Sequence, residues 1–183
     1  GTDWTAMGTG KAAYSSTPYI YALAMAGTNV LAGGFFQTAG GTGIHNLAKW
    51  NGSSWEAVGD ADYFLDEGTS YQNGYGAVRA ILVDGSNYYI GRDWAVLGPL
   101  IGEPDYWLKL GGLHKWDGTS WSSPGPRTTF NTTGEPGIYA LAKQGADIYC
   151  GGHFNSEPVY IGEADNELST NYISANSIYR WNG

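Results

Sequence analysis

The sequence predicts an all-β fold made of related units, and three observations lead to this prediction. A turn of the form Trp-Asn/Asp-Gly-x-Ser-Trp occupies residues 50–55 and 116–121, and it begins again at Trp181. Runs rich in β-branched and aromatic residues precede each turn, and Asn-Gly or Asp-Gly between such runs is a strong hairpin signal. Glycine fills 29 of the 183 positions and aromatic residues make up 15% of the chain, whereas charged residues make up only 14%.

Each unit contains four short runs that recur along the chain. The first runs are residues 20–24, 78–82 and 138–142, the second are 30–36, 88–94 and 148–154, and the third are 46–50, 112–116 and 177–181. The fourth run follows the turn, and Gly1-Thr2-Asp3-Trp4 matches Gly118-Thr119-Ser120-Trp121 in this position. We expect each run to be a β-strand and neighbouring runs to pair as antiparallel hairpins.

Four antiparallel strands in units of 51 to 66 residues are typical of a β-propeller blade. The sequence therefore predicts one propeller section over residues 1–183, with units 1–52, 53–118 and 119–183. The first runs carry Ala, Leu and Ile, and the Trp residues lie in the third and fourth runs, as a wedge with a narrow axis and a broad rim requires. Apolar residues on both faces of run 20–24 predict a strand covered on both sides.

The segments Gly33-Gly34-Phe35 and Asn46-Leu47-Ala48-Lys49-Trp50-Asn51-Gly52-Ser53-Ser54-Trp55 carry a family resemblance. They resemble kelch-type propeller repeats, among them those of bacterial surface proteins and of the fungal cortical polarity marker. The resemblance covers all three units, although the middle unit lacks the Gly-Gly pair and the later two have long insertions. It implies a propeller fold and only weakly a function, because propellers host many activities.

Three units form an incomplete ring, since closed propellers have about four to eight blades. The sequence begins at a fourth run and ends at a third. Two arrangements would cover the exposed sheet faces. Two copies could pair into a six-bladed homo-oligomer, or the chain could be part of a longer one with further blades.

Composition excludes several classes of function. The net charge of −8 and the lack of a basic cluster argue against nucleic-acid binding. No apolar stretch approaches the ~20 residues that span a bilayer, so we expect no membrane insertion. The only cysteine, Cys150, lies in an apolar run and is expected to be a buried, inert thiol. The low charge and the high Gly, Ser, Thr, Asn and Tyr content resemble secreted all-β proteins, so an extracellular or cell-surface location is expected.

The long connections after the second and fourth runs should lie together on one face of the units. They are residues 9–19, 37–45, 60–77, 95–111, 126–137 and 155–175, and they hold eleven of the seventeen acids. Exposed rings beside carboxylates suit carbohydrate ligands, and they equally suit protein contacts. The alternative is that the rings pack their own loops and the acids keep the face soluble. The candidate ligand-binding residues are Tyr63, Phe64, Tyr71, Tyr106, Trp107, Tyr160, Tyr172, Asp105 and Asp165.

Signals for catalysis are weak. His45, His114 and His153 fall at non-equivalent positions of the units, so we expect structural roles for them. The acids at 60–67 and 163–167 could supply calcium ligands, but neither cluster has the spacing of a known calcium loop, and no cofactor is expected.

We therefore expect a non-enzymatic recognition or adhesion module for carbohydrate or protein. The main alternative is a structural assembly protein of a surface filament, sheath or virion. A carboxylate-dependent glycan hydrolase or lyase is a weaker alternative.

Overall fold

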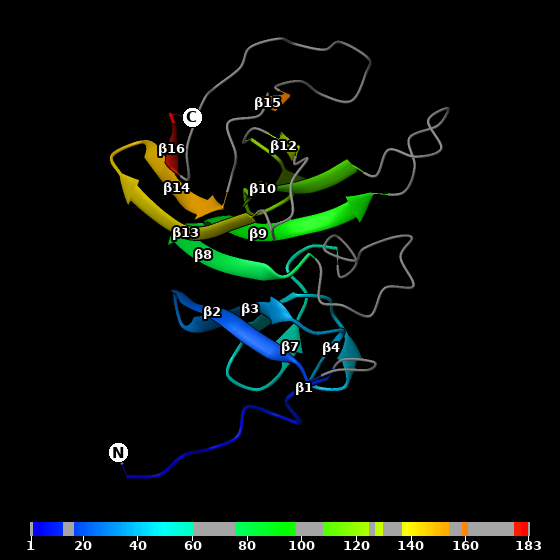
Figure 1. Ribbon diagram of the computed structural model, residues 1–183. Coiled ribbons are helices and arrows are strands. Elements are labelled where there is room, and N and C mark those ends of the chain that lie inside the picture. Colours follow the sequence, from blue (N-terminus) through cyan, green and yellow to red (C-terminus); the bar gives the residue numbers. More distant parts are fainter. Residues whose placement is uncertain are drawn as a thin grey trace.

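The computed structural model is all-β, and none of its described residues lies in a helix (Figure 1). It describes residues 2–12, 17–60, 76–97, 108–124, 127–129, 137–153, 159–160 and 178–182. Within these ranges there is accordingly no helix that could cross a membrane.

The first unit folds into a four-stranded antiparallel sheet with the strands in chain order. These are β2 (Tyr19–Ala26), β3 (Asn29–Phe35), β6 (Leu47–Trp50) and β7 (Trp55–Glu56). The expected strands and hairpins of this unit are confirmed. Gly27 turns the chain between β2 and β3 with a φ of +64°, a conformation that favours glycine.

The second and third units place their strands in the same order. The second has β8 (Val78–Asp84), β9 (Asn87–Leu97), β10 (Leu108–Trp116) and β11 (Trp121–Ser122). The third has β13 (Gly137–Gln144), β14 (Asp147–His153) and β16 (Ile178–Trp181). The β9–β10 hairpin is longer than the sequence predicts, since β9 continues to Leu97 and β10 begins at Leu108.

Several short strands lie in segments that the sequence assigned to loops, and that assignment was incomplete. They are β1 (Lys11–Ala12), β4 (Thr38–Ala39), β5 (Thr42–Gly43), β12 (Arg127–Thr129) and β15 (Val159–Tyr160). β1 pairs with β4, and β12 pairs with β15 and with β10. In both places a connection that follows a fourth run of the sequence meets one that follows a second strand, so these connections satisfy their backbone groups against each other.

The sheets of the second and third units are joined, which the sequence did not predict. Asp93 of β9 pairs with Gly137 of β13, so that nine strands form one curled sheet (Figure 1). A Cβ atom at Gly137 would lie 2.6 Å from the Cα atom of Asp93. The missing side chain of Gly137 therefore allows the two backbones to approach and the sheet to continue.

The first strands of the three units lie side by side, with β8 between β2 and β13 (Figure 1). No residue of β8 is exposed, whereas β2 exposes most of its length. The expectation that strand 20–24 is covered on both faces is therefore wrong for β2. The reason is its position, because within the described part of the chain β2 has a neighbouring first strand on one side only.

Two apolar layers hold the units together, and corresponding residues build both. Between the first and second units, Leu31 and Leu47 pack with Val78 and Ile90. Between the second and third units the same sequence positions are filled by Tyr89 and Leu113, which pack with Ile138 and Cys150. All eight residues are buried, so the two layers form the core of the stack.

Glycines allow the closest approach in each layer. A Cβ atom on Gly33 would lie 2.3 Å from Cγ1 of Val78, and one on Gly91 would lie 2.6 Å from Cγ2 of Ile138. Gly33 and Gly91 occupy the same position of their units, as do Val78 and Ile138. The same contact is therefore made twice along the chain.

The tryptophan turns also repeat in detail. The carboxamide of Asn51 accepts hydrogen bonds from the N–H groups of Ser53 and Ser54, each at 2.9 Å. Asp117 accepts the corresponding bonds from Thr119 and Ser120 at 2.8 Å, and these bonds hold the pKa of its carboxyl well below the ordinary value. The glycine that follows has a φ of +101° in both turns, which confirms the predicted Asn-Gly and Asp-Gly hairpins.

Candidate functional site

A row of side chains crosses the three first strands at the same position of each. Tyr21 of β2, Arg79 of β8 and Tyr139 of β13 each lie where the pairing register of their hairpin shifts by one residue. Such a shift marks a β-bulge, which bends a strand and re-aims its side chain. The three bulges therefore bring one side chain from each unit into a common row.

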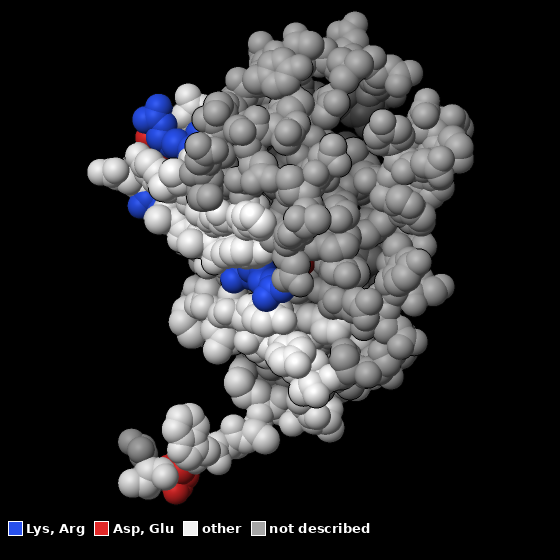
Figure 2. Space-filling view, viewed as in Figure 1, with Lys and Arg blue, Asp and Glu red and all other residues white. Residues whose placement is uncertain are grey.

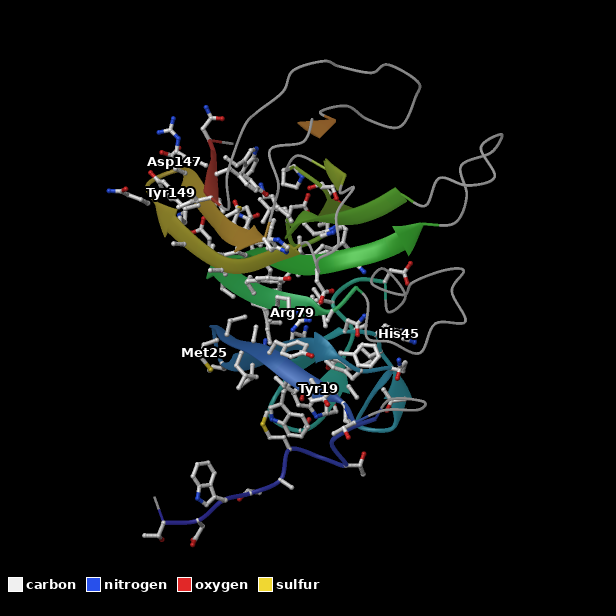
Figure 3. The ribbon with its side chains drawn as sticks, viewed as in Figure 1. Tyr19, Met25, His45, Arg79, Asp147 and Tyr149 are labelled. Atoms are coloured by element: carbon white, nitrogen blue, oxygen red, sulfur yellow. The ribbon has the colours of Figure 1, made fainter. Side chains whose placement is uncertain are left out.

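Arg79 lies between two tyrosine rings. Its Cζ atom is 4.0 Å from the ring centroid of Tyr21 and 5.8 Å from that of Tyr139. Tyr19 extends the row, because its ring stacks on that of Tyr21 with the centroids 5.9 Å apart and the planes inclined by 11°. Figure 3 shows Tyr19 on β2 and Arg79 in the space between β2 and β8. A guanidinium over tyrosine faces gains cation–π attraction.

The carboxylate of Asp93 holds the guanidinium of Arg79 in place. Nε and one terminal nitrogen of Arg79 both lie 2.7 Å from Oδ2 of Asp93. The Asp93 side chain is buried, and its Oδ1 has no hydrogen-bond partner among the described residues. The backbone N–H of Asp93 donates to the carbonyl of Ala77 at 3.0 Å, just before β8 begins. Arg79 lies on β8 and Asp93 on β9, and these two strands pair with each other.

Burial and the ion pair act against each other on the titration of these two groups. Burial raises the pKa of Asp93 to about 6, and the charge and hydrogen bond of Arg79 limit that rise. Burial acts to lower the pKa of Arg79, but the charge and hydrogen bond of Asp93 outweigh it and raise that pKa. At neutral pH the pair is therefore ionised, and Arg79 is fixed as a cation.

The row suits recognition by stacking and hydrogen bonding. Tyr19, Tyr21 and Tyr139 are exposed, and Arg79 is half-buried between them. Figure 2 shows a small basic patch at the middle of this view, and the described residues directly above and below it are mainly uncharged. The one carboxylate that contacts Arg79 in the described part of the chain is 2% exposed, so Asp93 serves to position Arg79. The row offers apolar ring faces and guanidinium donors to a ligand.

The row lies beside the connections that the sequence analysis singled out. β2, β8 and β13 each begin where such a connection ends, and Tyr21, Arg79 and Tyr139 are near those beginnings. Tyr160 lies in β15, where the structure describes the backbone only. The other candidates, namely Tyr63, Phe64, Tyr71, Tyr106, Trp107, Tyr172, Asp105 and Asp165, lie outside the described residues.

Sequence reasoning did not identify the row itself. The sequence does contain a signal for the row, because the alignment of the three first runs places Tyr21, Arg79 and Tyr139 at the same position. An arginine there, between tyrosines in the flanking units, breaks an otherwise apolar strand. The apolar residues on both sides of these positions indicate core strands, and that interpretation hid the row.

The other groups singled out from the sequence have the following positions. His45 precedes β6, His114 lies in β10 and His153 ends β14, so their positions do differ from unit to unit. Asp60 is exposed, and the remaining acids of the two candidate calcium clusters lie outside the described residues. No metal-ligand cluster of three or more His, Cys, Asp or Glu residues occurs in the described ranges.

Cys150 is buried, as the sequence predicts. Burial raises the pKa of its thiol to about 11, which keeps the thiolate scarce at neutral pH. Cys150 is therefore part of the core between the second and third units.

Comparisons with known proteins add no relative. Neither a family model, nor a curated protein, nor a solved structure matches the chain.

Proposed function

We propose that the chain is a section of a β-propeller that recognises a carbohydrate at an extracellular or cell surface, without turning it over. The observation that carries the proposal is the row of Tyr19, Tyr21, Arg79 and Tyr139, exposed where the first strands begin. The connections proposed as the ligand-binding face lead into these strands. In this proposal the row is the part of the ligand-binding face that the first strands contribute.

The propeller assignment is supported by the way the units pack. The same glycine-to-aliphatic contact and the same apolar layer occur between the first and second units and between the second and third. The first strands lie next to one another, and the joined sheet is curled (Figure 1). Blades around an axis require this arrangement, with the narrow strand of each wedge innermost.

Carbohydrate is favoured because the chemistry of the row matches that of a sugar. The C–H face of a pyranose packs against an aromatic ring, and its hydroxyl oxygens accept hydrogen bonds. The stacked rings of Tyr19 and Tyr21 supply such a platform, and the guanidinium of Arg79 supplies donors beside it. Because Asp93 neutralises Arg79, the row does not require an anionic sugar.

Glycan binding by Tyr21→Ala tests the proposal. We expect the wild-type chain to bind members of a glycan array, and Tyr21→Ala to bind the same glycans at least about tenfold more weakly, a loss of ~1.4 kcal/mol. Titration calorimetry with the best glycan measures the difference. Leu23→Ala is the matched control, since Leu23 is exposed on the same strand but outside the row.

Two results would count against this function. One is a wild-type chain that binds no glycan on the array. The other is equal weakening by Tyr21→Ala and Leu23→Ala, which would separate the row from the binding site. A protein ligand in place of a glycan would then be the remaining form of recognition.

The exposed apolar residues favour a second candidate, a structural assembly protein. Ile20, Leu23 and Met25 of β2 and Ile178 of β16 are exposed, although chains rarely leave such side chains uncovered together. Assembly predicts large species whose size grows with concentration in light scattering. Recognition alone predicts a particle of fixed size.

A further inference from the structure

Three charged residues of the middle unit stand where the flanking units carry aromatic rings, a histidine or glycine. Arg79 has the position of a tyrosine, Arg92 that of a glycine, and Asp93 that of a phenylalanine in the first unit and a histidine in the third. The flanking units form the same first hairpin without these three residues. The hairpin therefore does not require the ion pair of Arg79 and Asp93, and a role in the row accounts for it.

Arg79 uses only one oxygen of the Asp93 carboxylate. Its Nε and one terminal nitrogen both lie 2.7 Å from Oδ2, whereas Oδ1 is buried and has no hydrogen-bond partner among the described residues. Neither water nor a protein donor stabilises a negative charge on an oxygen in this position. Oδ1 can therefore take up a proton while both contacts at Oδ2 remain, and burial raises the pKa of Asp93 to about 6.

Two arginines act on the charge of Asp93. Arg79 reaches it from β8, and Arg92 precedes it in β9. On the other side of β9, β10 places Gly112 opposite Arg92, and His114 lies two residues further along β10. Arginine keeps its charge at every pH at which a carboxyl group titrates. Protonation of Asp93 therefore makes this part of the middle unit more positive.

The remaining neighbouring strands bring two tyrosine rings and a histidine. The rings of Tyr21 in β2 and Tyr139 in β13 lie against Arg79. His153 of β14 lies two strands away from Asp93, across β13. Tyrosine side chains are uncharged between pH 5 and 7.5, whereas histidine can gain a proton in that range. Assigning a pH response of the row to Asp93 therefore requires a control at His153.

Protonation of Asp93 changes the charge of the row and leaves its rings in place. With Asp93 ionised, the two charges of the pair cancel. With Asp93 protonated, the negative charge 2.7 Å from the guanidinium is lost and Arg79 remains a cation. This change in potential does not depend on which other groups contact Arg79. The side chain of Arg79 is 23% exposed, so its charge then attracts anions to the surface of the row.

We propose that protonation of Asp93 changes the ligand preference of the row, from neutral sugars to sugars that carry a carboxylate. The inference rests on the carbohydrate recognition proposed above. Sugar carboxylates resemble α-carboxyl groups, whose ordinary pKa is about 3.3–3.7, so they stay ionised at pH 5. A carboxylate and a guanidinium form short, charge-assisted hydrogen bonds. The tyrosine rings contact the sugar face in both states, and the charge of Arg79 selects the substituents of the sugar.

Binding of acidic glycans and of their methyl esters at two pH values tests this inference. The probes are uronic-acid glycans on an array, each beside its methyl ester, which keeps the ring faces and removes the charge. We expect the wild-type chain to bind the acidic form about tenfold more tightly at pH 5 than at pH 7.5, since one pKa unit of coupling to the Asp93 proton corresponds to a factor of ten. Binding of the ester should not change.

Two further measurements identify the proton. Titration calorimetry of the wild type near pH 6.5, in buffers with different ionisation enthalpies, should show that the acidic glycan takes up part of a proton on binding and the ester none. Asp93→Asn should bind the acidic glycan at pH 7.5 as tightly as the wild type does at pH 5, and His153→Gln should respond to pH as the wild type does. The net charge of −8 becomes less negative in acid, but this affects all three proteins alike. Circular dichroism checks that both variants are folded.

Three results would overturn the inference. They are an equal response of acid and ester to pH in the wild type, no proton uptake with the acidic glycan, and a pH response that survives Asp93→Asn but disappears in His153→Gln. The first two use the wild type alone, so they decide even if Asp93→Asn does not fold. Binding of neutral glycans without a gain for acidic ones at pH 5 would remove this inference and leave the proposed function standing. A chain that binds neither kind at either pH would contradict both.

Discussion

Gly34→Ala is expected to destabilise the protein by about 3 kcal/mol or more. A Cβ atom at Gly34 would lie 1.9 Å from the carbonyl oxygen of Tyr19, so the β2–β3 hairpin would have to move its backbone. Gly152 makes the same approach to the carbonyl oxygen of Gly137 in the third unit, also at 1.9 Å. Gly152→Ala should therefore have a similar effect. Urea denaturation measures both.

Gly43→Ala is the matched control, because nothing lies within 4 Å of a Cβ atom there and its φ is not positive. We expect its free energy of unfolding to stay within about 0.5 kcal/mol of the wild type. Equal losses for Gly34→Ala and Gly43→Ala would show that the close approach at the β2–β3 hairpin is absent in solution.

Arg79→Met should also be strongly destabilising, by roughly 3 kcal/mol at pH 7.5. It removes the hydrogen-bonded partner of the buried Asp93 carboxylate and keeps an unbranched apolar side chain in place of the inner part of Arg79. Breaking a buried ion pair by removing one partner typically costs about 3–5 kcal/mol. We expect a loss at the low end of this range, because the charge of Arg92 also acts on Asp93. The double variant Arg79→Met/Asp93→Asn should recover part of the loss, because it removes the buried charge as well.

The pH dependence of this loss follows from the pKa of Asp93. That pKa is raised from 3.8 to about 6, so the folded state binds the proton more tightly than the unfolded state does. The stabilisation linked to this proton is fully present below about pH 4 and is lost as the pH rises through 6. Without Arg79 the pKa rises further, so Arg79→Met should be less destabilising at pH 5 than at pH 7.5. Equal losses of unfolding free energy at pH 5 and pH 7.5 would contradict a raised pKa of Asp93.

Much of the fold could be predicted because its signals are local. The Trp-Asn-Gly and Trp-Asp-Gly turns fix hairpins with glycine at a φ of +101°, and the apolar runs between them become β2, β3, β8, β13 and β14. The two-residue strands β1, β4 and β5 could not be predicted, since two residues show no periodicity and their pairing depends on neighbouring connections. The link from Asp93 to Gly137 likewise depends on how two units meet.

The candidate site was less accessible to sequence reasoning for the same reason. Arg79 touches Tyr21 and Tyr139 only because three strands, about sixty residues apart in the chain, bulge at the same position. Composition pointed instead to the long connections, where rings and acids are dense. The row can be found when the units are aligned position by position. Residues at the same position of neighbouring units, here Tyr21, Arg79 and Tyr139, lie next to one another in the structure.

The repeated contact between units is the central claim, and nuclear Overhauser effects test it most directly. In methyl-labelled protein, the account predicts cross-peaks from the methyl groups of Val78 to the α-protons of Gly33 and from those of Ile138 to the α-protons of Gly91. Both cross-peaks are expected with similar intensity, because the two pairs occupy the same positions of successive units. A spectrum in which one pair is seen and the other is missing would contradict equivalent packing, and the absence of both would contradict the stack.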